Sequence, residues 1–117
     1  MMIQCRAINM EMTEAIENYI HKRMEPLVKY MAKFGDVPEA WAEVKRSTRH
    51  HKKGEVFNAE LHLKLPNHNL RSEAEAVDLY AAIDIAKDTM KRQLTEYKDK
   101  VAGQYKMHKN VKKSRKA

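Results

Sequence analysis

The sequence predicts an α+β domain with the order β-α-β-β-β-α, in which two helices pack on one face of a four-stranded sheet. Residues 57–65, FNAELHLKL, alternate strictly between apolar and polar side chains, which is typical of a strand with one wet face. Two longer segments, 13–34 and 77–104, repeat apolar residues at helical spacing. Shorter apolar segments before and between them predict the remaining strands.

The first strand is expected at residues 2–8 and the first helix at 13–34. Thr13 is a residue of the N-cap type, and Gly35 is the expected stop. Pro26 lies inside this helix, where it removes one backbone hydrogen bond and favours a bend. We expect the helix to remain one piece.

The next strand is expected at residues 39–49, with a basic hairpin loop at 45–53 and Gly54 at the end of that loop. A turn at 66–69, PNHN, then leads to the last strand at 70–75. The sequence therefore predicts three consecutive strands between the two helices.

The second helix is expected over residues 77–104, with Asp78 capping or supporting its start. Its apolar stripe consists of Leu79, Ile83, Ala86, Met90, Leu94, Tyr97 and Val101. The expected division of the chain is a folded domain at 1–104 and a basic, flexible tail at 105–117.

The positive charge of the chain is concentrated in its last residues. Segment 106–117, KMHKNVKKSRKA, holds six Lys or Arg and no acid, and the rest of the chain holds 17 basic and 16 acidic residues. Such a segment cannot bury enough apolar surface to fold alone, and its natural partner is a polyanion. A purely solubilising tail is the alternative interpretation.

Several classes of protein are disfavoured. The chain has no apolar run that could span a bilayer and no signal peptide, so a cytoplasmic location is expected. The single Cys5 excludes an internal disulfide and a zinc-type cysteine cluster. No acid–His or His–x3–His pair is expected to hold a metal, and no cofactor is expected. Asp78, Tyr80 and Asp84 lack a nucleophile or a glycine-rich loop beside them, so no enzyme is expected.

Lys and Arg side chains form two rows on the predicted helices. At about 100° per residue, Lys87, Lys91 and Lys98 fall nearly in line. The cations predicted to contact a phosphate-rich partner are Lys22, Arg23, Lys29, Lys33, Lys87, Lys91, Arg92, Lys98 and Lys100. Ordinary solvation of a helix surface is the alternative. Trp41 is either a stacking platform for bases or a partly covered edge residue.

Three segments, in this order, resemble the bacterial ribosome hibernation-promoting factors, also called ribosome-associated inhibitor A or factor Y and grouped as the sigma-54 modulation protein family. The segments are NMEMTEAIENYIHKR at 9–23, HKKGEVFNAELHLKLP at 51–66 and DLYAAID at 78–84, and the last is followed by KRQL and KDK. The resemblance covers roughly residues 1–104. The residues that match the motif frame are Asp78, Tyr80, Ala82, Ile83, Asp84 and Gln93.

The resemblance implies a fold related to double-stranded RNA-binding domains. It also implies binding to the small (30S) ribosomal subunit, in the channel between head and body, through 16S rRNA. A protein in that channel blocks mRNA and the A-site and P-site tRNAs, so translation stops and the idle 70S ribosome is preserved. The implied action is steric and involves no catalysis.

The chain departs from the family pattern at a few positions. Thr89 and Glu96 stand where relatives often have Lys, Pro26 replaces another common Lys, and Lys87 and Lys91 add charge. The length resembles the short family members, which support 100S ribosome dimers together with a separate partner. Two alternatives remain: a general structured-RNA-binding protein or RNA chaperone, and a protein–protein modulator of a sigma factor.

Overall fold

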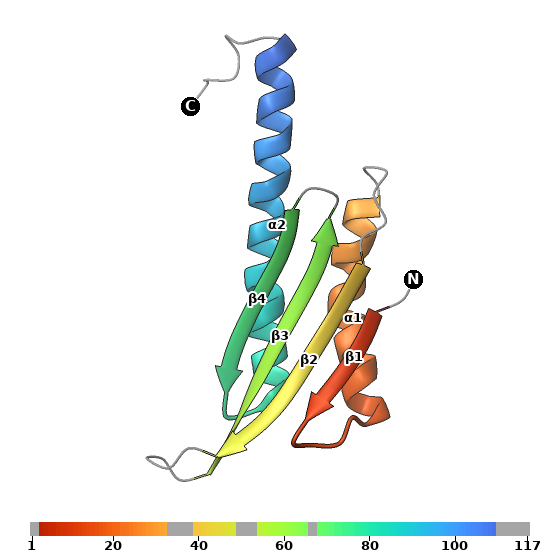
Figure 1. Ribbon diagram of the computed structural model, residues 1–117, viewed down its shortest axis with the longest axis vertical. Helices are drawn as coiled ribbons and strands as arrows, with labels where there is room; N and C mark the ends of the chain where they lie inside the picture. The colour runs from red at the N-terminus through yellow and green to blue at the C-terminus, as the bar shows by residue number, and fades with distance from the viewer. Residues whose placement is uncertain (1–2, 33–38, 49–53, 66–67, 110–117) are drawn as a thin grey trace.

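The computed structural model describes residues 3–32, 39–48, 54–65 and 68–109, and the side chains of the last range up to residue 100. The elements in chain order are β1 (Ile3–Ile8), α1 (Glu14–Ala32), β2 (Glu39–Thr48), β3 (Glu55–Leu65), β4 (His68–Ala76) and α2 (Leu79–Lys109) (Figure 1). The predicted order β-α-β-β-β-α is confirmed.

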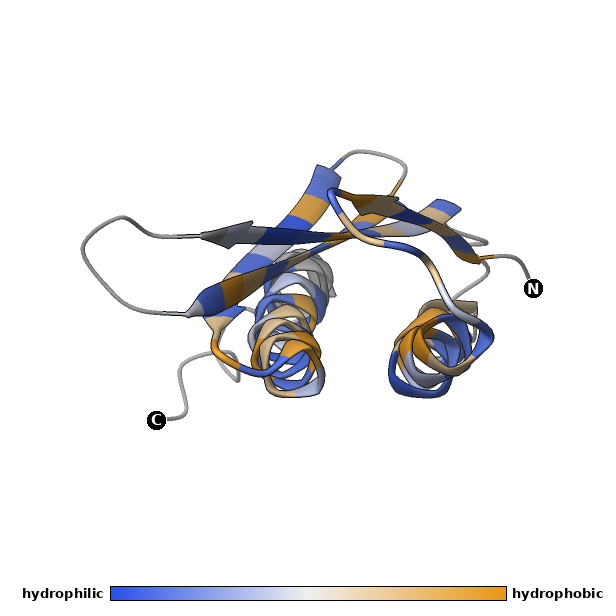
Figure 2. Ribbon diagram, turned by 90° about the horizontal axis from the view of Figure 1, so that it is seen from below, coloured by the Kyte–Doolittle hydropathy of each residue, from blue (hydrophilic) through white to orange (hydrophobic). Residues whose placement is uncertain are grey.

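The strands form one sheet in the order β1-β2-β3-β4. β1 and β2 are parallel and are joined through α1, whereas the pairs β2–β3 and β3–β4 are antiparallel. Figure 2 shows both helices on the same side of the sheet, which leaves the other face open. The predicted two-layer α+β architecture is therefore confirmed.

The core lies between the sheet and the two helices. On β3 the buried side chains are Ala59, Leu61, Leu63 and Leu65, which confirms the predicted alternation. The buried stripe of α1 consists of Ile16, Ile20, Met24, Leu27, Val28 and Met31. The buried stripe of α2 consists of Leu79, Ala82, Ile83, Ala86, Met90 and Leu94. In the described part of the chain, neither helix combines the length and the apolar character needed to cross a membrane.

Both helices begin with a side-chain cap. The hydroxyl of Thr13 accepts a hydrogen bond from the backbone N–H of Ile16 at 3.1 Å. The carboxylate of Asp78 accepts one from the backbone N–H of Ala81 at 3.0 Å. Each cap satisfies a backbone donor that has no partner within its own helix. The roles predicted for Thr13 and Asp78 are confirmed.

The boundaries differ from the expectation at three places. α2 extends beyond the expected end at residue 104 and reaches Lys109. An interior glycine costs a helix only about 1 kcal/mol, so it does not have to end α2. β4 begins at His68, which pairs with Leu65, so the turn is tighter than the expected 66–69. β3 already begins at Glu55. Residues 33–38 and 49–53, which include the expected helix stop and most of the basic hairpin, lie outside the described residues.

Two residues next to strand ends have a positive backbone φ angle. Asn9, directly after β1, has a φ of 59°, and Gly54, directly before β3, has a φ of 96°. Glycine adopts this region without a steric penalty, and asparagine tolerates it better than most residues. The predicted position of Gly54 at the end of the hairpin loop is therefore consistent with its conformation.

Ser72 is the one buried polar residue of the described core, and it joins β4 to α2. Its hydroxyl donates a hydrogen bond to the backbone carbonyl of Ala86 at 2.7 Å, and the residue is 3% exposed. We expect Ser72→Ala to lower the free energy of unfolding by about 1 kcal/mol in urea denaturation. Thr95 is the matched control, because its exposed hydroxyl donates to the carbonyl of Lys91 at 3.0 Å. Equal losses of unfolding free energy in Ser72→Ala and Thr95→Ala would contradict the expectation that the buried hydrogen bond contributes more than the exposed one.

Candidate nucleic-acid interface

A groove with a volume of about 270 Å³ runs between α1 and α2 on the surface of the helical layer. Its lining residues are Lys22, Arg23, Pro26, Leu27 and Tyr30 from α1, and Lys87, Lys91, Leu94 and Thr95 from α2. Leu27 and Leu94 are buried core residues. The groove therefore has a partly apolar lining to which each helix contributes two cations.

The helices bring these cations together because each one flanks a buried stripe. Lys22 and Arg23 come one turn before Leu27, and Lys87 and Lys91 come one turn apart before Leu94. When the stripes pack on the sheet, the flanking side chains face each other across the space between the helices. Of the predicted cations, Lys22, Arg23, Lys87 and Lys91 therefore line one groove between the two helices.

A cluster of three polar side chains ties α1 to α2 beside the groove. The Tyr19 hydroxyl donates to Asp84 Oδ1 at 2.6 Å, and Arg23 Nη2 donates to the Tyr19 oxygen at 3.1 Å. Arg23 Nε lies 2.9 Å from the same Asp84 oxygen, but its N–H has no hydrogen-bond partner, so this contact is an ion pair. The pKa of Arg23 is raised by the hydrogen bond with Tyr19 and by the charge of Asp84. We call these residues the Tyr19–Arg23–Asp84 cluster.

Tyr80 packs against the same cluster from α2. Its ring meets the ring of Tyr19 edge-on, with centroids 4.8 Å apart and planes at 87°. Edge-on aromatic pairs add to the energy of area burial. Tyr80 and Asp84 of the motif frame therefore contact the other helix, and Asp78 caps α2.

The position of Arg23 differs from the expectation of a freely exposed phosphate contact. Its side chain is 37% exposed and is ion-paired with Asp84 across the helix interface. The physical reason is that Tyr19 and Arg23 lie four residues apart on the face of α1 that turns toward α2. Arg23 therefore both lines the groove and links the helices.

Two more of the predicted cations have partners inside the protein. Lys87 Nζ lies 2.9 Å from Asp88 Oδ1, and this hydrogen bond is the main cause of a lowered pKa of Asp88. Lys98 Nζ lies 5.5 Å from the centroid of the Tyr30 ring, a cation–π contact from α2 to α1. Asp88 is thus paired with its neighbour in sequence.

The remaining predicted residues surround the groove or lie elsewhere. Lys29, Arg92 and Lys100 are exposed on the helices but do not line the groove, and Gln93 is half-buried on α2. Lys33 lies outside the described residues. Among the described residues, four of the predicted cations therefore line the groove.

Sequence reasoning missed the tyrosines of the interface. Neither Tyr19 nor Tyr30 was among the predicted site residues, yet both are half-buried and contact polar or charged groups. A usable signal was present, because Tyr19–Arg23 and Tyr80–Asp84 each show the four-residue spacing that brings side chains together on a helix.

Three side chains with metal-binding donor atoms lie close together between α1 and β1. Glu17 and His21 form an acid–histidine pair four residues apart on α1, and Cys5 of β1 joins them. Spacing within one segment could not show that a strand brings a third donor to the same place.

The open face of the sheet carries balanced charges and a stacked pair of rings. Trp41 lies there, and its ring stacks on His62 with centroids 4.6 Å apart and planes at 8°. Arg71 is ion-paired with both Glu60 and Glu73. One face of the indole is therefore already covered by a ring of the protein itself.

We expect Arg23→Glu to lower the melting temperature, because it places a carboxylate against Asp84 and removes the hydrogen bond to Tyr19. Arg92→Glu, an exposed reversal on α2, should leave the melting temperature nearly unchanged. The double variant Arg23→Glu with Asp84→Arg should recover most of the loss, as measured by thermal unfolding. No recovery in the double variant would contradict the ion pair.

Comparison with known proteins identifies the family of the chain. Residues 3–102 match the family described as sigma 54 modulation protein / S30EA ribosomal protein. A ribosome hibernation promotion factor of Staphylococcus aureus is 37% identical over 93 residues, which cover 80% of this chain and 46% of that protein. The chain thus spans about half the length of this curated relative.

Two solved structures are similar. The N-terminal domain of Thermus thermophilus Protein Y matches with a TM-score of 0.62 and 33% identity, over 83% of this chain and 99% of that one. A ribosomal subunit interface protein from Coxiella burnetii matches with a TM-score of 0.63, over 82% and 96% of the two chains, and its 17% identity makes it a likeness of fold alone. Because the family match covers most of the chain, the protein belongs to the sigma 54 modulation protein / S30EA ribosomal protein family, which includes the ribosome hibernation promotion factors.

Proposed function

We propose that the protein is a ribosome hibernation factor that acts in the cytoplasm and binds the small (30S) ribosomal subunit through 16S rRNA. The observation that carries the proposal is the groove between α1 and α2, where Lys22, Arg23, Lys87 and Lys91 meet. Family membership supports the ribosome as the partner. The bound position is the channel between head and body, at the decoding region.

The electrostatics of the groove favour a polyanion with a regular backbone. Arg23 and Lys87 have carboxylate partners, whereas Lys22 and Lys91 lie outside the ion pairs of the described residues. Lysine contacts phosphate as a point charge and carries no base information, so the groove is suited to recognising the shape and backbone of folded RNA. The residues Lys29, Arg92, Lys98 and Lys100 extend this contact along the helices.

The proposed mechanism is steric exclusion. A domain with principal extents of 56 × 32 × 19 Å occupies the decoding channel and leaves no room for mRNA or for tRNA in the A and P sites. Translation is inhibited without a chemical step, and the idle 70S ribosome is preserved. We further propose that the silenced ribosomes form 100S dimers.

The test is sedimentation of stationary-phase extract through a sucrose gradient, with detection of the protein in each fraction. We expect the protein in the 30S, 70S and 100S fractions. Free duplex RNA, added in excess to purified protein and 30S subunits, should compete poorly, because the assembled subunit offers the complete site. Absence from all ribosomal fractions, or effective competition by duplex RNA, would contradict the proposal and favour a general RNA-binding protein.

The basic segment 106–117 provides a second test. We propose that it runs along rRNA or the mRNA path, because it contains six Lys or Arg and no acid. Deletion of this segment should weaken 30S binding and reduce the dependence of affinity on salt, since fewer counterions are released. A full-length control with the six cations replaced by Gln should behave like the deletion. Unchanged affinity and salt slope in both variants would contradict a contact with RNA.

A further inference from the structure

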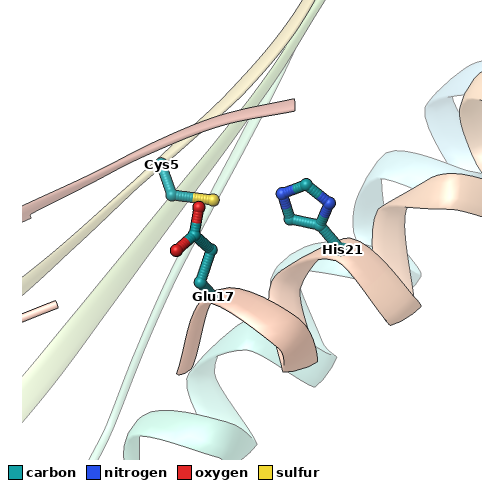
Figure 3. A group of neighbouring side chains, drawn as sticks. All are labelled: Cys5, Glu17 and His21. Carbon is teal, nitrogen blue, oxygen red and sulfur yellow. The ribbon is translucent and has the colours of Figure 1, made fainter. Parts of the chain in front are cut away.

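Three side chains with metal-binding donor atoms meet between β1 and α1, away from the groove (Figure 3). Cys5 comes from β1, and Glu17 and His21 come from successive turns of α1. The thiol sulfur, a carboxylate oxygen and an imidazole nitrogen lie within 4.8 Å of one another. Figure 3 shows all three side chains pointing toward a shared space, so donors of three chemical types converge from two elements.

The fold explains this convergence. Side chains on one face of a strand recur every second residue, so Cys5 shares the helix-facing side of β1 with Ile3. Residues four apart on a helix lie one above the other, so Glu17 and His21 both face β1. The parallel pairing of β1 with β2 holds β1 in place beside α1.

The imidazole of His21 supplies a second, independent observation. His21 Nε2 is buried and has no hydrogen-bond partner among the described residues. A buried ring nitrogen without a partner loses the hydrogen bond that it would make to water. In Figure 3 this nitrogen is on the side of the ring that faces Cys5 and Glu17. A ligand placed among the three side chains would satisfy it.

We propose that Cys5, Glu17 and His21 bind a zinc ion, with Sγ, a carboxylate oxygen and Nε2 as three ligands and a water molecule as the fourth. Zinc bond lengths of about 2.0–2.3 Å and tetrahedral angles require ligand atoms roughly 3.3–3.6 Å apart. The observed separations of at most 4.8 Å are close to this arrangement. Because Glu17 is exposed, rotation of its side chain between staggered rotamers can close the remaining gap.

The donor set selects the metal. A thiolate with an imidazole and a carboxylate suits zinc, whereas magnesium and calcium prefer oxygen ligands alone. Burial and the nearby Glu17 raise the pKa of the Cys5 thiol to about 11. When zinc binds, the thiol proton passes to solvent, and the resulting thiolate and carboxylate together balance the charge of the ion.

The ion would join the edge of the sheet to the helix that carries Lys22 and Arg23. β1 is an edge strand, paired with β2 alone in the described sheet. A ligand that binds the folded state and not the unfolded state stabilises the protein by mass action. Zinc at 100 times its dissociation constant should therefore raise the melting temperature by roughly 10 °C.

Cobalt provides the direct test, because a tetrahedral cobalt–thiolate complex has a charge-transfer band in the near ultraviolet. Cys5 is the single cysteine of the chain, so this band reports metal binding at the proposed site and not at the other histidines. We expect one equivalent of Co²⁺ to produce the band in the full chain, and Zn²⁺ to remove it by displacement. Cys5→Ser should abolish the band, and His21→Gln should weaken cobalt binding at least 10-fold.

Matched controls separate the site from general metal affinity. Glu17→Gln should weaken binding, whereas Glu14→Gln, an exposed acid in the first turn of the same helix, should not. His62→Gln, on the open face of the sheet, should also have no effect. Absence of the charge-transfer band, equal affinity in His21→Gln and the wild type, or a metal-dependent doubling of mass would overturn the proposal.

Discussion

Reversal of two charges in the groove, Lys22→Glu with Lys91→Glu, is expected to lower affinity for the 30S subunit by about 100-fold or more at roughly 0.1 M salt. Both side chains are exposed, one from each helix, and both line the groove. A phosphate contact contributes close to one unit of salt slope, which is about 10-fold in affinity at this salt concentration. The replacement carboxylates add repulsion to the loss of two contacts.

The fold of this double variant should be intact. Lys22 and Lys91 make no ion pair within the described part of the chain, and surface substitutions of this kind change stability little. Thermal unfolding measured beside 30S binding checks this point. A loss of binding with an unchanged melting temperature assigns the effect to the interface.

Lys45→Glu with Lys64→Glu is the matched control. Both lysines are exposed on the open face of the sheet, and the change in net charge is the same. We expect at most a few-fold loss of 30S affinity, because this face lies opposite the helices. Equal losses in the two double variants would show that net charge, rather than the groove, determines binding.

Patterning alone was sufficient to predict the architecture. The alternation of 57–65 identified the half-buried strand, because side chains on a sheet alternate between the core and solvent. The apolar stripes identified both helices, and the two N-caps were recognised from Thr13 and Asp78. These features depend on neighbours along the chain, which a sequence displays directly.

The details of the site depend on contacts between elements, which periodicity does not display. The rows of lysines could be placed on each helix, but the ion pair of Arg23 with Asp84 joins residues 61 positions apart. The same holds for Tyr19, whose hydroxyl meets that carboxylate. The relation between Cys5 and His21 also required the packing of β1 on α1.

Replacement of Pro26 by Ala is expected to raise the free energy of unfolding by about 2 kcal/mol. Pro26 lies in the interior of α1, which runs from Glu14 to Ala32 without a break. A proline there removes the hydrogen bond to the carbonyl of Lys22 and costs about 3 kcal/mol relative to alanine. About 1 kcal/mol of this is offset, because proline also restricts the unfolded chain. The side chain is exposed, so the replacement leaves no cavity in the core.

Urea denaturation of Pro26→Ala measures this gain, with Lys29→Ala as the control at an exposed position one turn further along the same helix. Lys29→Ala should change the free energy of unfolding by less than about 0.5 kcal/mol, since lysine and alanine are both good helix formers. Affinity of Pro26→Ala for the 30S subunit should stay within a few-fold of the wild type, because the four groove cations are retained. A less stable Pro26→Ala protein would show that the core packs against a bend that only proline produces. A more stable protein that no longer binds would show that Pro26 sets the spacing of the cations across the groove.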